Sequence, residues 1–426
     1  MRTIFHVDGD AFFAACEQAV HPDWVGRAVI TGAERGIVSA ASYEAKAKGV
    51  SRGTALWDVH RIIPDAIIVP SDYETYSTFS NRMFNIVRRF TPEVEEYSID
   101  EAFVDVTGCD RMYNCSYNEL ALRIQSVVVR ELGISVSIGI GPSKVLAKVG
   151  SKWKKPSGVT EITVDTRESY LSKLDVEKIW GIGNAHAARF RMAGIRTAWQ
   201  FASMPESTMK QSLYKPLKEI WHELNGTSVN PVITSIKQAY KSISKVKTFT
   251  PPSSNALYLK ARIMRNLENA CIKARRYGLL AGSVGLYLRK QDFRSAYGEH
   301  KLAIASVYPS ELFSVLENMF DTLFDQRALY RATGVVLLGL HSTGQAQKSL
   351  FSHYNASKKL AGLYKSMDQI NRRYGKHTVA TGTSLRLTHQ PYHTSSRGNI
   401  PIRAQKRLIG ETSRQRINIP LLHVVV

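Results

Sequence analysis

Short apolar runs alternate with amphipathic segments over the first 165 residues. Residues 3–8 (TIFHVD) form an apolar run that predicts a buried strand ending in an acid. Apolar residues then recur at helical spacing over 73–90, followed by predicted strands at 93–97 and 101–106, a helix at 118–132 and a strand at 135–140. This order predicts an antiparallel sheet with helices packed on one face.

The second half of the chain contains another predicted sheet unit. Helices are short beyond residue 165, and two glycines interrupt them at 179–183 (IWGIG). Residues 231–244 are polar and are typical of a linker. The segments that follow are predicted as strand, helix, two strands, helix and strand, at 245–249, 256–277, 281–289, 301–306, 310–326 and 334–340. The fold class is therefore α+β, and 426 residues suit two to four domains.

Charge is distributed unevenly along the chain. The formal net charge is +21, from 57 Lys and Arg against 36 Asp and Glu. Residues 1–165 carry a net charge of −3, residues 166–242 carry +5, residues 243–341 carry +7, and residues 342–426 carry +12. Such an excess indicates a polyanionic partner, nucleic acid before an anionic membrane, with a merely basic surface as the alternative. The partition predicts an acid-rich, metal-dependent site followed by modules that hold a polyanion.

Composition and cysteine spacing exclude several classes of protein. A hydrophobic content of 44% without a long apolar run excludes a disordered or membrane-spanning chain. The four cysteines, at positions 16, 109, 115 and 271, form no C-x-x-C pair, which argues against a disulfide framework or a zinc ribbon. We expect a cytoplasmic protein without membrane association.

Three carboxylates fall where predicted strands end or turn. Asp8 closes the first strand, and Asp100 and Glu101 occupy the corner between two others. Because neighbouring side chains of a strand point to opposite faces, Asp100 and Glu101 meet one ion only if the backbone turns there. Three converging carboxylates suit two Mg²⁺ ions, which prefer oxygen ligands and leave positions for phosphates. The alternative is a set of turn and surface acids. Asp10 and Asp105 are further candidates, although Asp10 also suits a cap for the following helix.

Four segments carry a family resemblance: VDGDAFFAACE at 7–17, YSIDEAFVDVTG at 97–108, SIGIGPSKVLAK at 137–148 and KKPSG at 154–158. In this order they resemble the palm motifs of Y-family translesion DNA polymerases. The resemblance implies a right-handed polymerase with a ferredoxin-like palm, small fingers, a helix-hairpin-helix thumb and a βαββαβ little finger. The implied boundaries are 1–17 and 72–165 for the palm, 18–71 for the fingers, 166–230 for the thumb, 231–244 for a linker, 245–341 for the little finger and 342–426 for a basic tail.

The resemblance also implies roles for individual residues. Asp8, Asp100 and Glu101 match the family's metal ligands, with the Gly9 carbonyl completing the site. Phe13 matches the steric gate that excludes a 2′-hydroxyl from the incoming sugar, and Phe12 would pack beside it.

Three further positions, Tyr43, Lys46 and Lys155, match residues that hold the incoming triphosphate. Two departures weaken the match in the fingers. Polymerase IV-type members typically have Arg where this chain has Lys46, and Thr where it has Ala40, so a bidentate phosphate contact is lost.

DNA contacts are implied in both halves of the chain. Gly181 and Gly183 resemble the turn of a helix-hairpin-helix, whose backbone N–H groups reach a phosphate without reading sequence. In the little finger, four cations are predicted as phosphate contacts: Lys245, Lys247, Arg289 and Lys290.

The tail contains a motif that resembles a bacterial sliding-clamp peptide, QKSLF at residues 347–351. Leu350 and Phe351 would fill an apolar pocket, with Gln347 making polar contacts. A basic tail that continues past this motif, with a helical piece predicted at 359–373, looks more like the UmuC type than the polymerase IV type. The UmuC type implies partners of the processed UmuD and RecA kinds. The alternative is a tail that only adds nonspecific DNA affinity.

These observations predict a template-directed DNA polymerase that performs translesion synthesis by two-metal nucleotidyl transfer. Its substrates would be primer-template DNA and deoxynucleoside triphosphates. Two other functions stay open on the sequence: a catalytically inactive DNA-binding accessory subunit, and a metal nuclease that uses the same carboxylates.

Overall fold

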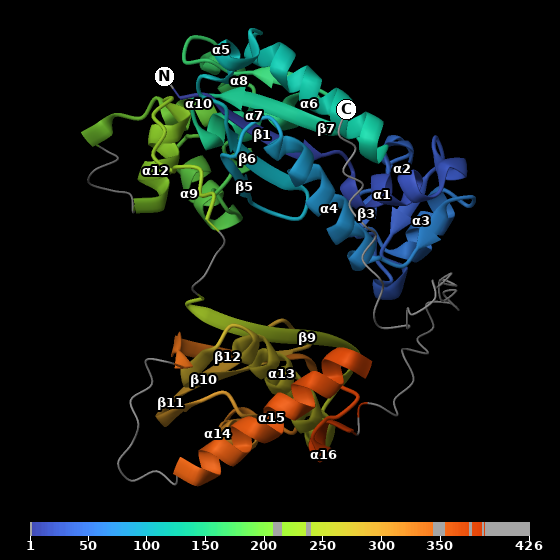
Figure 1. Cartoon of the computed structure of the whole chain (residues 1–426), viewed down its shortest axis with the longest axis vertical. Helices are drawn as coiled ribbons and strands as arrows, with labels where there is room; N and C mark the ends of the chain where they lie inside the picture. The colour runs from blue at the N-terminus through green and yellow to red at the C-terminus, as the bar shows by residue number, and fades with distance from the viewer. Residues whose placement is uncertain are drawn as a thin grey trace. The chain divides into compact units, whose positions relative to one another are not determined.

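The structure is a computed structural model of the chain and describes residues 2–207, 215–235, 240–343, 354–374, 377–385 and 387. The described residues form two compact units, unit 1 up to residue 235 and unit 2 from residue 240 (Figure 1). Each unit has its own hydrophobic core.

Unit 1 is built around a five-stranded sheet with the strand order β5-β6-β1-β7-β8. The strands are β1 (Ile4–Gly9), β5 (Val94–Glu96), β6 (Glu101–Asp105), β7 (Val136–Gly141) and β8 (Val159–Glu161). One face is covered by α1 (Phe12–Val20), α4 (Tyr73–Arg88) and α6 (Tyr117–Leu132), which follows the short α5 (Cys109–Tyr113). Strand β1 lies between β6 and β7 and pairs antiparallel with both, as the order of elements predicted.

The other face of this sheet is covered in part by α7 (Lys144–Trp153), which packs against β1 and β7. Glycine permits this close approach, because a Cβ on Gly139 would lie 1.8 Å from the Ala147 carbonyl oxygen. The prediction of helices on one face alone is therefore wrong for this part of the sheet.

A small lobe inserted between α1 and α4 has its own three-stranded sheet, of order β3-β2-β4. Its elements are η1 (Pro22–Trp24), β2 (Val29–Thr31), η2 (Ala33–Arg35), β3 (Ala40–Ala41), α2 (Tyr43–Ala47), α3 (Leu56–Ile62) and β4 (Ile67–Val69). The Ser42 side chain caps α2 by accepting from the Ala45 amide. This cap fixes the start of the helix that carries Tyr43 and Lys46.

Short helices after residue 165 form a helical lobe: α8 (Arg167–Leu171), η3 (Val176–Lys178), α9 (Asn184–Met192), α10 (Ala198–Ala202) and α12 (Lys215–Leu224). Their apolar side chains share a core with Val145, Leu146 and Val149 of α7. The helical lobe is therefore packed on the sheet of unit 1 through α7.

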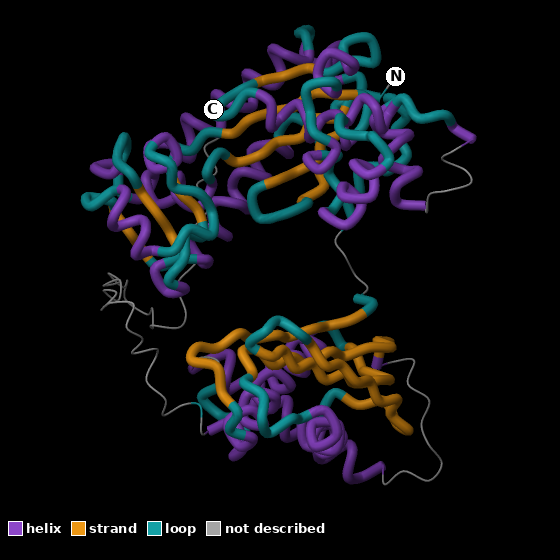
Figure 2. The backbone as a smooth tube through the Cα atoms, turned by 180° about the vertical axis from the view of Figure 1, so that it is seen from behind, coloured by secondary structure: helices purple, strands orange, loops and turns teal. Residues whose placement is uncertain are grey.

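Unit 2 has the predicted order of strand, helix, two strands, helix and strand. The elements are β9 (Ser242–Ser253), α13 (Ala256–Arg276), β10 (Leu279–Lys290), β11 (Ser295–Ser306), α14 (Pro309–Leu323) and β12 (Tyr330–Ser342). The strands form one sheet of order β11-β10-β12-β9, and Figure 2 shows its helices gathered on one side. The α+β, multidomain fold class is confirmed.

The described part of the tail folds onto unit 2. Helix α15 (Tyr354–Tyr374) is longer than the predicted piece at 359–373 and is followed by α16 (Gly382–Leu385). Both Arg275 nitrogens Nε and Nη2 donate to the Asp368 carboxylate at 2.7 Å, which ties α15 to α13. Glu268 of α13 accepts from the Thr381 amide and hydroxyl, each at 2.8 Å. These residues of the tail therefore belong to the fold of unit 2.

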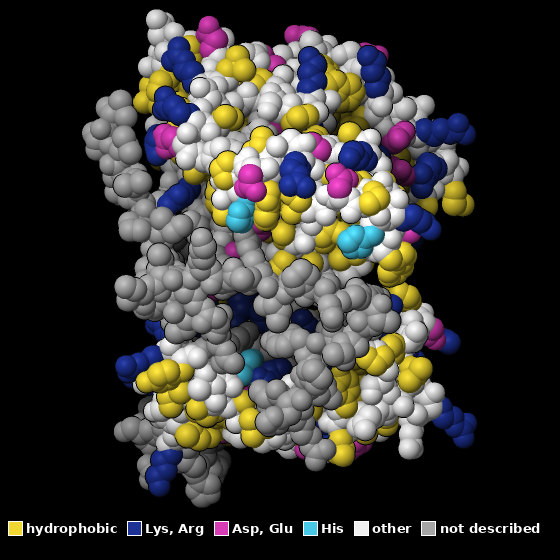
Figure 3. Space-filling model, turned by 90° about the vertical axis from the view of Figure 1, so that its right-hand side faces the viewer, with side chains coloured by type: hydrophobic (Ala, Val, Ile, Leu, Met, Phe, Trp, Pro, Cys, Tyr) yellow, Lys and Arg dark blue, Asp and Glu magenta, His cyan; other side chains and the backbone are white. Residues whose placement is uncertain are grey.

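No helix in the described part of the chain is long and apolar enough to cross a membrane. The face of unit 1 in Figure 3 shows Lys and Arg side chains interspersed with Asp and Glu side chains.

Candidate active site

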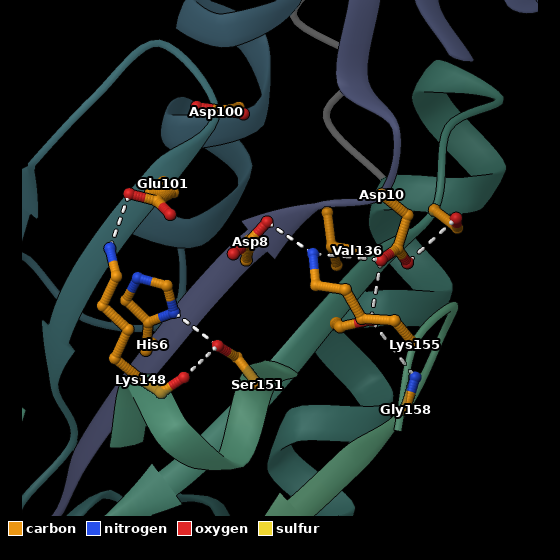
Figure 4. Close-up of polar contacts among 12 residues, drawn as sticks. His6, Asp8, Asp10, Asp100, Glu101, Val136, Lys148, Ser151, Lys155 and Gly158 are labelled. Atoms are coloured by element: carbon orange, nitrogen blue, oxygen red, sulfur yellow. Dashed lines mark hydrogen bonds and ion pairs between the residues drawn. The ribbon is translucent and has the colours of Figure 1, made fainter. Parts of the chain in front are cut away.

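The register of β1 and β6 brings two of the predicted carboxylates together. Asp8 pairs directly with Glu101, so both side chains lie on the face of the sheet that α7 covers. His6, Asp8 and Glu101 each offer one possible ligand atom, and these three atoms lie within 4.8 Å of one another. The carboxylate of Asp100 lies apart from this group (Figure 4) and accepts a hydrogen bond from the Ser98 hydroxyl at 2.6 Å. The structure therefore places Asp8 and Glu101 together and leaves the Asp100 side chain at the preceding corner.

Backbone contacts hold that corner against the end of β1. The Gly9 amide donates to the Asp100 carbonyl oxygen at 2.8 Å. A Cβ on Gly9 would lie 2.8 Å from Cδ2 of Phe12. Glycine at position 9 therefore lets the chain pass between Phe12 and the corner, which explains the residue type without assigning it a metal contact.

Each of the paired carboxylates is bound to a lysine. The Lys155 Nζ lies 2.6 Å from Asp8 Oδ1, and the Lys148 Nζ lies 2.8 Å from Glu101 Oε2 (Figure 4). Burial raises the pKa of Asp8 from 3.8 to about 6, opposed by Lys155 and assisted by the nearby Glu101 and Asp100 charges. The site therefore holds more negative charge than its lysines neutralise.

Asp10 occupies the centre of a polar network that sequence reasoning missed. The residue is 1% exposed, and its carboxylate accepts from the hydroxyls of Ser135 and Ser137 at 3.1 and 2.8 Å and from the Ser157 amide at 2.8 Å. The Lys155 ammonium lies 3.4 Å away. The predicted cap is wrong, because α1 starts after Ala11 and has no side-chain cap. Asp10 instead holds the loop that carries Lys155.

Two of the three residues predicted to hold the triphosphate, Tyr43 and Lys46, lie near Asp10 and belong to α2 of the small lobe. The Tyr43 hydroxyl donates to Asp10 at 3.4 Å, and the Lys46 ammonium lies 4.3 Å from the centre of the Tyr43 ring. Burial and repulsion from Lys155 lower the pKa of Lys46. Cations that repel one another in this way are typical of a site that receives an anion.

The two adjacent phenylalanines of α1 have different environments. Phe12 is 3% exposed and belongs to the core between the sheet and its helices. Phe13 is half-buried and stacks on Tyr76 with ring centres 4.5 Å apart. Tyr73 meets the same ring edge-on at 5.5 Å. These contacts fix the Phe13 ring, while Phe12 has a packing role.

The glycines of the IWGIG segment lie between η3 and α9. Gly181 has a φ of +93°, and a Cβ there would lie 2.7 Å from Cδ1 of Ile220. A larger residue is therefore excluded by both strain and space. Gly183 immediately precedes α9 and has open space where a side chain would stand. The first amides of α9 are consequently accessible at this turn.

The four predicted cations of unit 2 do not share one face of its sheet. Lys245 and Lys247 pair with the buried residues Val335 and Thr333, so their side chains leave edge strand β9 on the helix-covered side. Arg289 alternates with the buried Leu288 and therefore points from the opposite, open face. The Lys290 ammonium is 3.0 Å from Asp325. Only Arg289 of this set lies on the open face.

The clamp motif residues Gln347, Leu350 and Phe351 lie outside the described residues.

The donor chemistry of the site fits a divalent cation. Asp8 and Glu101 present carboxylate oxygens at one place, and the raised pKa of Asp8 shows that its charge lacks full compensation. His6 is fully buried, and its Nε2 has no hydrogen-bond partner among the described residues. The Nδ1 of the same ring lies 2.7 Å from the Ser151 hydroxyl. The two carboxylates therefore suit an oxygen-preferring metal ion, whereas the His6 nitrogen is a ligand type that such an ion does not prefer.

Comparisons with known proteins agree with this arrangement. Residues 7–152 match the impB/mucB/samB family, and residues 240–350 match the C-terminal domain of that family. DNA polymerase IV of Dehalococcoides mccartyi strain CBDB1 is 31% identical over 91% of this chain and 98% of its own length. DNA polymerase IV 1 of Bacillus subtilis is 29% identical over 90% of this chain and 94% of its own length. A solved Y-family DNA polymerase chimera of Dbh and Dpo4 gives a TM-score of 0.65 at 26% identity, covering 80% of this chain and 99% of the chimera.

The fold and the paired carboxylates, together with these matches, define a DNA-directed DNA polymerase. Within that class the chain belongs to the Y family, the translesion DNA polymerases. The relatives named above are of the polymerase IV type, whereas the basic tail resembles the UmuC type more closely. Both types lie within the Y family, so the expected family is confirmed.

Proposed function

We propose that this polymerase extends primers by two-metal nucleotidyl transfer, with Asp8, Asp100 and Glu101 as the metal ligands. The observation that carries the proposal is the direct pairing of Asp8 with Glu101 on one sheet face, where burial raises the pKa of Asp8 to about 6. Magnesium is the expected ion, because it prefers carboxylate and phosphate oxygens. For Asp100 to join this set, its carboxylate, whose Oδ1 now accepts from the Ser98 hydroxyl, must turn toward Asp8 and Glu101.

The residues of the chain divide the work of the reaction. When bound, two divalent ions supply activation of the primer 3′-hydroxyl and stabilisation of the leaving pyrophosphate. The triphosphate is received by Lys155, Lys46 and the Tyr43 hydroxyl, which lie beside the carboxylates. The two lysines repel each other when no triphosphate lies between them. The Gly9 carbonyl stays a proposed further ligand.

Sugar selection is assigned to Phe13. Its ring is clamped by Tyr76 and Tyr73, so it cannot swing aside to make room for a 2′-hydroxyl. Phe12, which is part of the core, supports α1 and has no proposed contact with the sugar.

The domain assignment follows the same proposal. The five-stranded sheet with its helices is the palm (1–17 and 72–165), the small lobe is the fingers (18–71) and the helical lobe is the thumb (166–230). The linker expected at 231–244 ends earlier than expected, because β9 begins at Ser242, and the little finger proposed at 245–341 includes residues 242–244 as well. Gly181 and Gly183 would bring backbone amides to a DNA phosphate, and Arg289 is the best placed of the four cations proposed in the little finger.

The remaining partners are proposed from the sequence alone. QKSLF at 347–351 would bind a sliding clamp, and the tail would meet UmuD-type and RecA-type proteins if the chain acts as the UmuC type does. Primer-template DNA and deoxynucleoside triphosphates are the substrates, and the cytoplasm is the proposed location.

A primer-extension assay tests the proposed mechanism. The full chain is incubated with primer-template DNA and nucleotides, with Mg²⁺ or with EDTA, and the matched variants are Asp100→Ala and the exposed Asp65→Ala. We expect Mg²⁺-dependent extension that Asp100→Ala abolishes and Asp65→Ala retains, with DNA binding intact in both. Full extension by Asp100→Ala would remove this residue from the ligand set. DNA cleavage without nucleotides would favour a nuclease instead.

A further inference from the structure

Lys148 lies in an enclosure that none of the roles above explains. Its side chain is 6% exposed, although a lysine is almost never buried without a partner. Three rings surround the ammonium, with centres 4.7 Å away in Tyr97, 5.8 Å in Phe103 and 5.3 Å in Trp180. We call these three residues the aromatic cage. The fourth neighbour is Glu101, whose Oε2 accepts from the ammonium at 2.8 Å.

The aromatic cage strengthens the hold of Lys148 on Glu101. Ring faces attract a cation, and the attraction grows when water is excluded. An ammonium that moved away from Glu101 would lose these ring contacts together with its ion pair. Because a metal ion at Glu101 has to compete with the ammonium for the same carboxylate, the cage also sets the strength of that competition.

One wall of the cage belongs to a different part of unit 1. Trp180 is the second residue of the IWGIG hairpin, and its neighbours Ile179 and Ile182 are buried in the core of the helical lobe. The indole Nε1 donates to the Tyr97 hydroxyl at 3.1 Å. The indole also meets the rings of Tyr97 and Phe103 at 5.3 and 5.4 Å.

The conformation of the hairpin fixes the indole in this position. The left-handed Gly181 follows Trp180 directly and reverses the chain against Ile220. The same short segment therefore contributes side chains to the lobe core, the Trp180 ring to the cage and open backbone amides to solvent at Gly183. A displacement of the hairpin must move the Trp180 ring.

We propose that Trp180 is a positioning residue through which the IWGIG hairpin controls metal binding at Glu101. It acts by setting how firmly Lys148 occupies that carboxylate. This inference rests on the proposed function, because Glu101 is taken as a metal ligand and the hairpin as a DNA contact. It links DNA grip to the metal site through a continuous set of contacts within unit 1.

The test measures Mn²⁺ binding to the full-length chain without DNA or nucleotide, by electron paramagnetic resonance of the free ion. Trp180→Leu removes one wall of the cage, Trp180→Phe retains a ring, and Trp199→Leu removes a tryptophan of the same lobe that packs beside Arg167. We expect Trp180→Leu to bind Mn²⁺ about threefold to tenfold more tightly than the wild type, because the competing ammonium is held less firmly. Trp180→Phe and Trp199→Leu should stay close to the wild type.

A double-mutant cycle shows whether Trp180 acts through Lys148. In a Lys148→Met background no ammonium competes, so Trp180→Leu should leave Mn²⁺ affinity unchanged. Weaker or unaltered Mn²⁺ binding by Trp180→Leu, an equal effect of Trp199→Leu, or a persisting effect in the Lys148→Met background would each overturn the proposal. Thermal unfolding checks whether each variant is folded. If Lys148→Met does not fold, the Trp180 and Trp199 variants alone decide whether Trp180 controls Mn²⁺ affinity.

A separate outcome distinguishes the inference from the proposed function. A wild-type chain that binds Mn²⁺ with the expected dependence on Trp180 but fails to extend primers overturns the polymerase mechanism. The same result supports the inference about Trp180, whose readout is binding and not catalysis.

Discussion

Asp8 should reduce the stability of the protein when no metal is bound. Its carboxylate is 6% exposed, and its pKa is raised from 3.8 to about 6 although Lys155 lies 2.6 Å away. That difference corresponds to about 3 kcal/mol of unfavourable free energy for the ionised group at neutral pH. Replacement by the isosteric Asn removes this penalty, and because the raised pKa already includes the attraction of Lys155, no separate cost is subtracted for the lost ion pair. We therefore expect Asp8→Asn to stabilise unit 1 by about 3 kcal/mol.

The pH dependence follows from the direction of the pKa shift. Between pH 3.8 and about 6 the folded chain keeps a proton on Asp8 that the unfolded chain has released. The contribution of Asp8 to the free energy of unfolding therefore falls as the pH rises through this window. Below about pH 4 the Asp8 carboxyl is neutral in both the folded and the unfolded chain, so Asn gives no gain in stability. Above about pH 6 the full gain in stability from Asn is expected.

Thermal unfolding in EDTA measures this effect, with the exposed Asp65→Asn as the matched control. At pH 7.5 we expect the transition of unit 1 to rise by about 6–12 °C in Asp8→Asn and to stay unchanged in Asp65→Asn. Added Mg²⁺ should stabilise the wild type and leave Asp8→Asn unaffected. A lower transition temperature for Asp8→Asn, or an advantage that persists at pH 4, would refute the electrostatic reasoning.

Three further variants test other parts of the structure. Asp10→Asn replaces one of the two oxygens that accept from Ser135, Ser137 and the Ser157 amide by a donor, and leaves Asp8 as the one carboxylate of this pair beside Lys155, so we expect a destabilisation of about 2 kcal/mol and a raised KM for nucleotides in steady-state primer extension. Phe13→Ala should admit ribonucleotides, measured as the ratio of ribonucleotide to deoxynucleotide incorporation; an unchanged ratio would remove Phe13 from the gate. Arg275→Met leaves Asp368 unpaired at the α13–α15 contact and should expose α15 to limited proteolysis without changing cleavage of unit 1.

Local patterns were sufficient to predict most of the fold. The apolar run of β1 reflects burial of both faces of the strand, and the helical spacing of α4 reflects burial of one face. The meeting of Asp8 and Glu101 was also predictable, because Asp8 lies near the end of β1 and Glu101 at the start of β6, its antiparallel neighbour. The Asp100 side chain was not, because a turn residue has no fixed face and its hydroxyl partner Ser98 competes for the carboxylate.

The role of Asp10 and the docking of the tail depend on distant residues. Asp10 is held by Ser135, Ser137 and Ser157, which are more than 120 positions away. Ser137 and Ser157 lie within two of the motifs, but nothing in those motifs pairs them with Asp10. The pairing of Arg275 with Asp368 spans 93 positions in the same way. No local period contains such information, so only the folded chain reveals it.

The DNA contacts proposed in unit 2 stay a prediction, but the face on which each cation lies could have been derived from the sequence. Ile243, Lys245, Lys247 and Phe249 occupy alternate positions of one strand, and the first and last are buried. Alternation alone therefore places both lysines on the helix-covered side. Lys245 and Lys247 therefore lie on the face opposite to Arg289, although the three residues were predicted together as phosphate contacts.

The charges at the active site explain why metal and nucleotide should enter together. Asp8, Asp10, Asp100 and Glu101 place four carboxylates around two lysines, Lys148 and Lys155. A nucleoside triphosphate adds about four more negative charges, so without metal it would meet net repulsion there. Two divalent ions alone would reverse the sign, with Lys46 adding to the excess. Among the states with a ligand bound, only the metal–nucleotide combination restores the near-neutral balance of the empty site, which makes each a condition for tight binding of the other.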